Sequence, residues 1–283
     1  MKKIILKRGS VLLLALVLFV TLLPLGAFAA PSYTISVSSW SNFKSRVDNN
    51  SSWNGGSSAS YKLTADITIP AGESVTKTFT GTFDGNGHTI TTSGTIFSTV
   101  GAGATIKNFT VEMPGDSSSS ISSPPVAYSI SASNTTAITF QNITNNANVT
   151  IPSGSTSYGA GIVGRIASNA TVVFDNCINN GHITSANQTG GIVANAPDTS
   201  TYSASLTFKN CVNNGNVTTS NLFAGGILGH SEGKANLSFN YCTNKGNIQS
   251  GGNAGGIFGN FRSGGSTKFD YCINMGSITQ SGS

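Results

Sequence analysis

The chain has 283 residues, of which only 9% are charged, and its formal net charge is +5 at neutral pH. Lys2, Lys3, Lys7 and Arg8 supply most of that excess, so the rest of the chain is close to neutral. This excludes the strong positive field that nucleic acids or acidic surfaces require, and we expect no nucleic-acid partner.

Residues 1–29 resemble an export signal peptide. A basic start precedes an apolar run from Val11 to Leu23, and Ala27 and Ala29 form a small-residue cleavage site. The run is short for a membrane span, which favours a cleaved signal over a membrane anchor. The sequence therefore predicts a protein that is secreted or held at the cell surface, with no membrane span after cleavage.

Residues 30–60 are predicted to form an N-terminal cap made of a short helix and a loop. Trp40, Phe43 and Val47 follow helical spacing behind Ser39, a residue type that caps helices. Such a helix would cover the open end of the first coil, which would otherwise expose a strand edge.

Residues 61–283 are organised by a repeated stretch, of which residues 174–184 (FDNCINNGHIT) are one copy. Copies begin at Ile106, Phe140, Phe174, Phe208, Phe239 and Phe269, at spacings of 34, 34, 34, 31 and 30 residues. Aromatic and β-branched residues in short runs bounded by Asn and Gly favour strands, and a Gly-Ile-Val run precedes most copies. The sequence predicts an all-β fold, a right-handed parallel β-helix of about six to seven coils with three strands in each coil of 30–34 residues.

An asparagine recurs at one position of the repeat. Its copies are Asn145, Asn179, Asn213, Asn244 and Asn274. Because stacked parallel strands lie roughly 4.8 Å apart, their side-chain amides can bond to one another as a ladder. Two residues later stand Ala147, Gly181, Gly215, Gly246 and Gly276, and we expect the glycines to adopt left-handed backbone angles.

Residues 114–137 interrupt the array with a Ser- and Pro-rich stretch. The spacing of 34 residues between Ile106 and Phe140 is nevertheless kept. We therefore predict a surface loop within one coil, with Tyr128 at the position that Ile162 has in the next coil.

Several stretches resemble a known group of proteins. They are residues 81–90 (GTFDGNGHTI), 94–97, 104–111, and the Gly-Gly-Ile motifs at 190–193 and 225–229. Over most of residues 60–280 the chain is similar to bacterial secreted or cell-surface β-helix proteins with GLUG-type repeats, which are adhesin-like. The resemblance implies a fold and a setting but no catalytic residues. The chain departs from it in its cysteine column and in the lack of an attached enzymatic or anchoring domain.

Candidate catalytic groups are few. Asp175 and Asp270 share a repeat position but are about three coils apart, and His88 and Asp84 lie in one turn. His230 and Glu232 could form an acid–base pair, although a polar outer face is the simpler interpretation. We expect no catalytic site, no metal site and no cofactor, because no His, Cys and carboxylate spacing fits one.

Four cysteines occupy a position held by Phe109 and Ile143 in earlier coils. They are Cys177, Cys211, Cys242 and Cys272. An apolar column favours buried free thiols. Export and the short distance between coils leave disulfides open as the alternative.

Two columns are predicted to border a shallow trough along the solenoid axis. One contains Tyr158, Gln188, Phe223 and Asn253, and the other contains Arg165, Asn195, His230 and Asn260. Aromatic faces beside planar amides suit sugar rings. The alternative is that the two aromatic rings only cover loop backbone.

The sequence favours a binding or adhesion module that holds a glycan, matrix or extracellular surface protein. The alternative is a β-helix carbohydrate-active enzyme, a polysaccharide lyase or hydrolase, which only the fold supports. A minor alternative is ice or crystal-surface binding through the column of Thr150, Thr184, Thr218, Gln249 and Thr279. The last repeat has no evident cap, so we expect that end to be covered by a partner, to dimerise or to fray.

Overall fold

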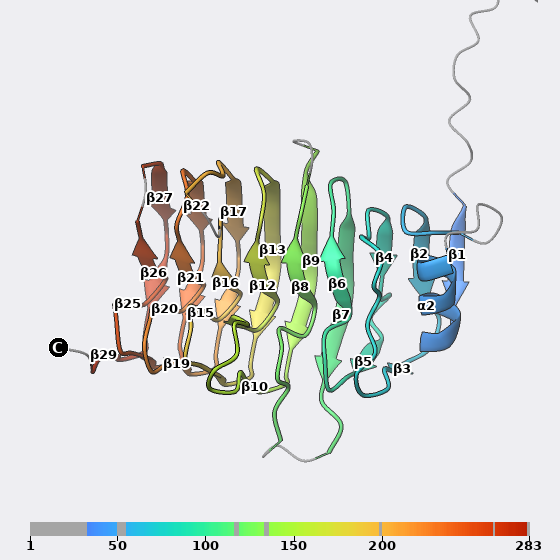
Figure 1. Cartoon of the computed structure of the whole chain (residues 1–283), viewed down its shortest axis with the longest axis horizontal. Coiled ribbons are helices and arrows are strands. Elements are labelled where there is room, and N and C mark those ends of the chain that lie inside the picture. The colour runs from blue at the N-terminus through green and yellow to red at the C-terminus, as the bar shows by residue number, and fades with distance from the viewer. Residues whose placement is uncertain are drawn as a thin grey trace, which may run out of the picture. The chain divides into compact units, whose positions relative to one another are not determined.

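The computed structural model describes residues 33–49, 55–115, 119–132, 136–197, 200–262 and 264–281. From Thr34 onward they form one unit, a parallel β-solenoid of about six turns with one short helix near its start (Figure 1). The expected signal peptide, residues 1–29, lies outside this part of the chain. No helix among the described residues is long and apolar enough to cross a membrane.

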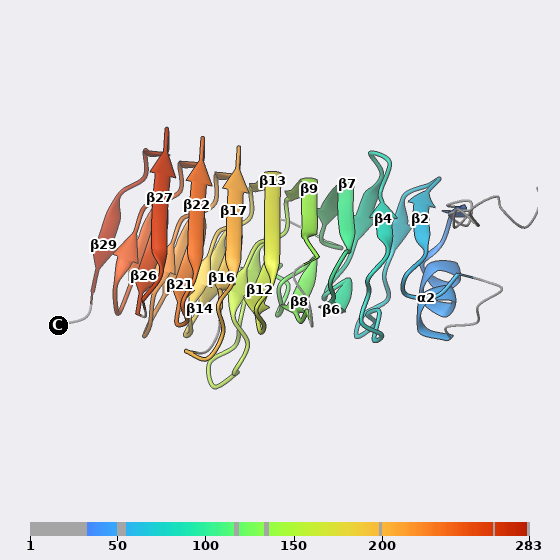
Figure 2. The same ribbon diagram turned by 90° about the horizontal axis from the view of Figure 1, so that it is seen from above.

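Four parallel sheets, here named A to D, run along the solenoid, so that corresponding strands of successive coils lie side by side (Figure 2). Sheet A contains β1 (Thr34–Val37), β2 (Ser60–Leu63), β3 (Ile67–Thr68), β4 (Thr82–Asp84), β5 (Thr89–Thr91), β7 (Thr105–Glu112), β9 (Ile138–Asn145), β13 (Thr171–Asn179), β17 (Ser205–Lys209), β18 (Val212–Asn213), β22 (Asn236–Asn240), β23 (Thr243–Asn244), β27 (Ser266–Asp270) and β28 (Ile273–Asn274). Sheet B contains β6 (Phe97–Val100), β8 (Ala127–Ile130), β12 (Val163–Ile166), β16 (Val193–Asn195), β21 (Leu228–Ser231) and β26 (Phe258–Phe261).

The two smaller sheets begin later in the chain. Sheet C contains β10 (Val149–Thr150), β14 (Ile183–Ser185), β19 (Val217–Thr219), β24 (Ile248–Ser250) and β29 (Ile278–Gln280). Sheet D contains β11 (Gly159–Ala160), β15 (Thr189–Gly190), β20 (Ala224–Gly225) and β25 (Ala254–Gly255). The predicted three strands per coil are therefore wrong for these coils. The Gly-Ile-Val run does not form a single strand, because the chain bends at its Gly-Ile pair between sheets D and B.

The repeat register brings like residues together in the core. Phe174 pairs with Phe140 and with Phe208 across neighbouring strands. The rings from Phe140 to Phe269 stack almost parallel, with neighbouring centroids 4.9–5.1 Å apart. This spacing matches the distance between hydrogen-bonded strands, so each of these coils adds one ring to a continuous stack in the core.

The repeated asparagines, all buried except Asn274, form a continuous hydrogen-bonded ladder. The Nδ2 group of Asn145 donates to Oδ1 of Asn179, and the same bond recurs from Asn179 to Asn213, from Asn213 to Asn244 and from Asn244 to Asn274, at 2.7–2.8 Å. Each Nδ2 also donates to a carbonyl two residues ahead, such as Gly215 O from Asn213 at 2.7 Å. Both amide hydrogens are thus used inside the wall.

The glycines beside this ladder do not adopt left-handed angles, which corrects the prediction from sequence. Glycine is needed at these positions because the backbones of successive coils approach closely at the turn that follows the ladder asparagine. A Cβ atom built on Gly215 would lie 1.9 Å from the carbonyl oxygen of Gly181, and one on Gly181 would lie 1.9 Å from that of Ala147. Left-handed residues occur instead at a bend two residues after the first residue of each repeat copy.

That bend contains Asn108, Asn142, Asn176 and Asn210, with φ between 52° and 62°, and then Tyr241 and Tyr271 at 55° and 50°. Asparagine tolerates this conformation, whereas tyrosine is an unusual occupant. The exposed amides of Asn142 and Asn176 each donate to the previous asparagine at 2.9 Å. This second ladder was not foreseen from the sequence.

The four cysteines are free thiols. Each Sγ donates to the carbonyl of a phenylalanine in the preceding coil, at 3.3–3.6 Å. Burial raises the pKa of Cys211, and a hydrogen bond with Cys211 followed by burial raises the pKa of Cys242. Cys211 and Cys242 therefore act as protonated core packing.

Helix α2 (Trp40–Asn49) fills the open interior of the first coil. Its Phe43 is fully buried, with ring centroids 5.1 Å from Tyr61 and 4.8 Å from Phe83. Ser39 Oγ accepts a hydrogen bond from the backbone N–H of Asn42, as an N-cap residue does.

The stretch 114–137 is only partly a surface loop. Ala127–Ile130 form β8, which pairs with β6 and β12 in sheet B, next to the edge strand β6. Val126, Ala127 and Ile130 are fully buried, and this burial draws the segment into the coil. Val163 pairs with Ala127, so Tyr128 does not take the position of Ile162 as the constant spacing implied.

Candidate functional site

The two predicted trough columns lie on neighbouring sheets. Arg165, Asn195, His230 and Asn260 occupy equivalent positions on β12, β16, β21 and β26, each paired with the next. Tyr158, Gln188, Phe223 and Asn253 directly precede β11, β15, β20 and β25. We call these eight residues together with Tyr128 the sheet B strip.

Within the strip, side chains from the two columns contact each other in the later coils. The ring of Phe223 lies over the imidazole of His230 with centroids 4.6 Å apart. Asn253 Nδ2 donates to Asn260 Oδ1 at 2.6 Å. In these coils the two columns therefore pack against each other.

His230 is the strip's buried titratable group. Its side chain is 1% exposed, which overturns the expected polar outer face. Its Nε2 lies 3.1 Å from Glu232 Oε2, and its Nδ1 lies 3.1 Å from the carbonyl oxygen of Asn260. Burial lowers the pKa of His230 despite these partners, so the imidazole is neutral at neutral pH. The Phe223 ring lies over this imidazole, a contact that sequence periodicity does not reveal.

Asn195 stands next to His230 in the column and is 2% exposed. Its Oδ1 has no hydrogen-bond partner among the described residues. A buried amide oxygen without a partner is costly, and because this oxygen is closed off from solvent a ligand at the surface does not reach it.

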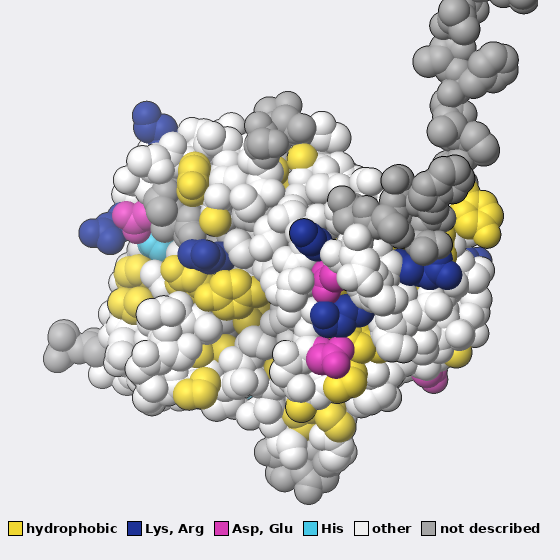
Figure 3. All heavy atoms as spheres, turned by 45° about the vertical axis from the view of Figure 1, so that its right-hand side comes forward, with side chains coloured by type: hydrophobic (Ala, Val, Ile, Leu, Met, Phe, Trp, Pro, Cys, Tyr) yellow, Lys and Arg dark blue, Asp and Glu magenta, His cyan; other side chains and the backbone are white. Residues whose placement is uncertain are grey.

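Aromatic rings line the strip on the outside. Tyr128, Tyr158 and Phe223 are all half-buried, and the guanidinium of Arg165 lies 5.7 Å from the centre of the Tyr128 ring. Figure 3, turned by 45° from Figure 1, shows hydrophobic side chains gathered beside basic ones on this side of the molecule. The strip thus offers apolar ring surface, a cation and amides together.

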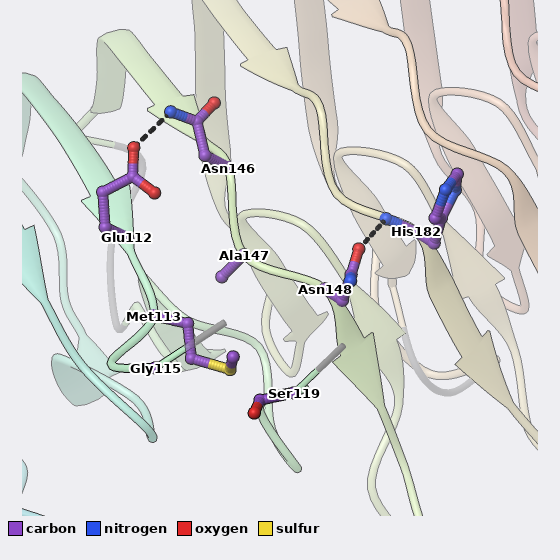
Figure 4. A pocket seen from close by; sticks show the side chains of 8 residues that line it. All are labelled: Glu112, Met113, Gly115, Ser119, Asn146, Ala147, Asn148 and His182. Carbon is purple, nitrogen blue, oxygen red and sulfur yellow. Dashed lines mark hydrogen bonds between the residues drawn. The ribbon is translucent and has the colours of Figure 1, made fainter. Parts of the chain in front are cut away.

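A separate hollow of about 480 Å³ lies where β7 and β9 end, lined by Glu112, Met113, Asn146, Asn148 and His182 among others (Figure 4). Its polar groups already bond between coils. Asn146 donates to Glu112, and Asn148 Oδ1 accepts the backbone N–H of His182 at 2.8 Å. His182 Nδ1 in turn accepts the backbone N–H of Asn216 at 3.0 Å. The histidine here replaces an asparagine in a structural ladder.

The remaining polar candidates also have local roles. His88 Nδ1 lies 3.1 Å from Asp66 Oδ1, so its partner is Asp66 and not the Asp84 of its own turn. Asp84 Oδ1 accepts the backbone N–H of Asn86 at 2.8 Å, which closes that turn. In the described part of the chain, no group of three or more His, Cys, Asp or Glu residues could hold a metal ion.

The threonine column lies in register along sheet C. Thr150, Thr184 and Thr279 are exposed, Thr218 is half-buried, and the exposed Gln249 interrupts the row. A hollow of about 560 Å³ runs beside it. The column lacks the aromatic and charged groups of the sheet B strip.

No protein-family model and no curated protein matches the chain. Among solved structures, the chain is similar to a protein from Bacteroides ovatus described as a "putative immunoglobulin A1 protease". The TM-score is 0.60 and the identity 16%, over 89% of this chain and 84% of that one. At this identity the likeness shows a shared β-solenoid fold.

Proposed function

We propose that this chain is a secreted or cell-surface binding module that holds a glycan along the sheet B strip. The observation that carries the proposal is the presence of three half-buried rings, Tyr128, Tyr158 and Phe223, in one strip, with the guanidinium of Arg165 5.7 Å from the centre of the Tyr128 ring. Sugar rings present apolar C–H faces to aromatic rings and hydroxyl groups to amides and cations. The resemblance to GLUG-type adhesin-like proteins and the signal-like residues 1–29 support the extracellular setting.

A carbohydrate-cleaving enzyme is the second candidate, and the contact of His230 with Glu232 at 3.1 Å is the observation in its favour. The 1% exposure of the His230 side chain opposes it, because a general acid or base must reach the proton it transfers. The similar Bacteroides ovatus protein is described as a protease, so proteolysis is a further activity to assay. The only link between the two chains is their shared fold.

The double variant Tyr158→Ala, Phe223→Ala tests the proposal. Residues 30–283 are screened on glycan and matrix-protein arrays, and the affinity of the best ligand is measured by calorimetry. Two lost ring contacts at about 0.5–1.5 kcal/mol each predict binding that is weaker by about fivefold to 150-fold.

The control is Tyr241→Asn, because Tyr241 is an exposed tyrosine in sheet A at a bend where other coils have asparagine. It should bind as the original chain does. Full binding by a double variant with an unchanged melting temperature would remove the strip as the site. Turnover in a parallel depolymerisation screen would favour the enzyme.

A further inference from the structure

Exposed apolar surface is concentrated at one end of the solenoid. Apart from Tyr33, the large hydrophobic residues that are exposed in the described structure belong to the last two coils: Tyr241, Phe261, Phe269, Tyr271, Ile273, Met275 and Ile278. Phe269 is 52% exposed, whereas Phe239 in the same column is fully buried. A hollow of about 550 Å³ opens between β26 and β27, lined by Phe258, Phe269 and Cys272 among others.

Among the described residues, the other end of the solenoid has no matching group of exposed hydrophobic side chains. There α2 fills the interior, and its Trp40, Phe43 and Val47 are buried (Figure 1). Head-to-tail stacking would require the outer face of the last coil to fit that helix-filled end. A twofold contact needs only one self-complementary face.

We propose that a second copy of this chain covers the outer face of the last coil, with β27 pairing antiparallel to β27 of the second copy. In β27 the inward residues are Thr267 and Phe269, equivalent to the buried Leu237 and Phe239, and they alternate with Lys268 and Asp270. Opposed residues of an antiparallel pair lie on the same side of the sheet. The twofold axis must therefore place one residue of β27 opposite the same residue of the second copy. An axis between two consecutive residues would place an inward side chain opposite an outward one.

Charge selects one register among those that remain. An axis through Lys268 would oppose two lysines, and an axis through Asp270 would oppose two aspartates. An axis through Phe269 sets Lys268 opposite Asp270 of the second copy, twice by symmetry. It also sets Phe269 against its own copy, which continues the phenylalanine stack of the core. Opposite charges across a strand pair stabilise it and like charges destabilise it.

A charge exchange tests this arrangement by sedimentation velocity of residues 30–283 over a range of concentrations. The chain should show a monomer–dimer equilibrium. Lys268→Asp alone and Asp270→Lys alone should each weaken the dimer roughly tenfold, because each creates two like-charge contacts. The double variant Lys268→Asp, Asp270→Lys should restore the original dissociation constant.

Lys209→Asp is the control, since Lys209 is an exposed residue in the column of Asp270 but lies two coils before the end of the solenoid. It should leave the dimer unchanged, and circular dichroism should show all variants folded. A chain that stays monomeric, a chain that forms open-ended oligomers, or a double variant no tighter than the single variants would overturn the proposal. None of these outcomes depends on glycan binding.

Discussion

Asn213→Ala is expected to lower the free energy of unfolding by about 2–4 kcal/mol, because it removes an internal rung of the buried ladder. The side chain of Asn213 is fully buried and makes three hydrogen bonds. Its removal leaves Gly215 O and Asn244 Oδ1 without their donor and deprives Asn179 Nδ2 of an acceptor. These groups lie in the wall of the solenoid, where water cannot replace the missing amide.

Asn274→Ala is the matched control for this prediction. Asn274 is the last rung and is exposed, so water can reach the groups that lose a partner. We expect a loss below about 1 kcal/mol. Urea unfolding followed by circular dichroism compares the two variants, and equal losses would show that the ladder is not a buried, cooperative element.

Gly215→Ala is expected to destabilise the fold by more than about 3 kcal/mol, or to prevent folding, because a backbone atom blocks the new methyl group. The added Cβ would lie 1.9 Å from the carbonyl oxygen of Gly181 and 2.5 Å from its carbon. Neither atom can move without separating two coils. The cost arises from steric overlap rather than from backbone angles.

Gly94→Ala provides the comparison, since a Cβ at Gly94 meets no atom within 4 Å. This variant should melt within a few degrees of the original chain. A Gly215→Ala protein that melts alongside Gly94→Ala would mean that the coils are further apart at the corner than the structure shows.

The repeated columns could be predicted because a solenoid places residues one period apart directly beside each other. The phenylalanine stack and the asparagine ladder follow from that single geometric fact. The repeat period in the sequence does not show how the chain bends within one coil. The bend at the Gly-Ile pair depends on the path of the chain within a coil. The reason for Gly215 is its close approach to Gly181 of the preceding coil, and the repeat spacing shows that these residues are neighbours but not how close they come.

The candidate site shows the same limit. Sequence spacing predicted that Asn195, His230 and Asn260 follow one another along the axis, as they do. It did not predict that Phe223 would cover His230, because that contact joins different columns of one coil. It also misplaced Tyr128, since a constant spacing between Ile106 and Phe140 concealed a shifted register within the intervening coil.

The central claim is that a buried asparagine ladder holds the coils in register, and hydrogen exchange of the side-chain amides by NMR tests it most directly. The Nδ2 hydrogens of Asn145, Asn179, Asn213 and Asn244 should exchange slowly, because both hydrogens of each group are bonded inside the wall. Those of the exposed Asn142 and Asn176 should exchange rapidly. Equally rapid exchange at all six asparagines would contradict the account.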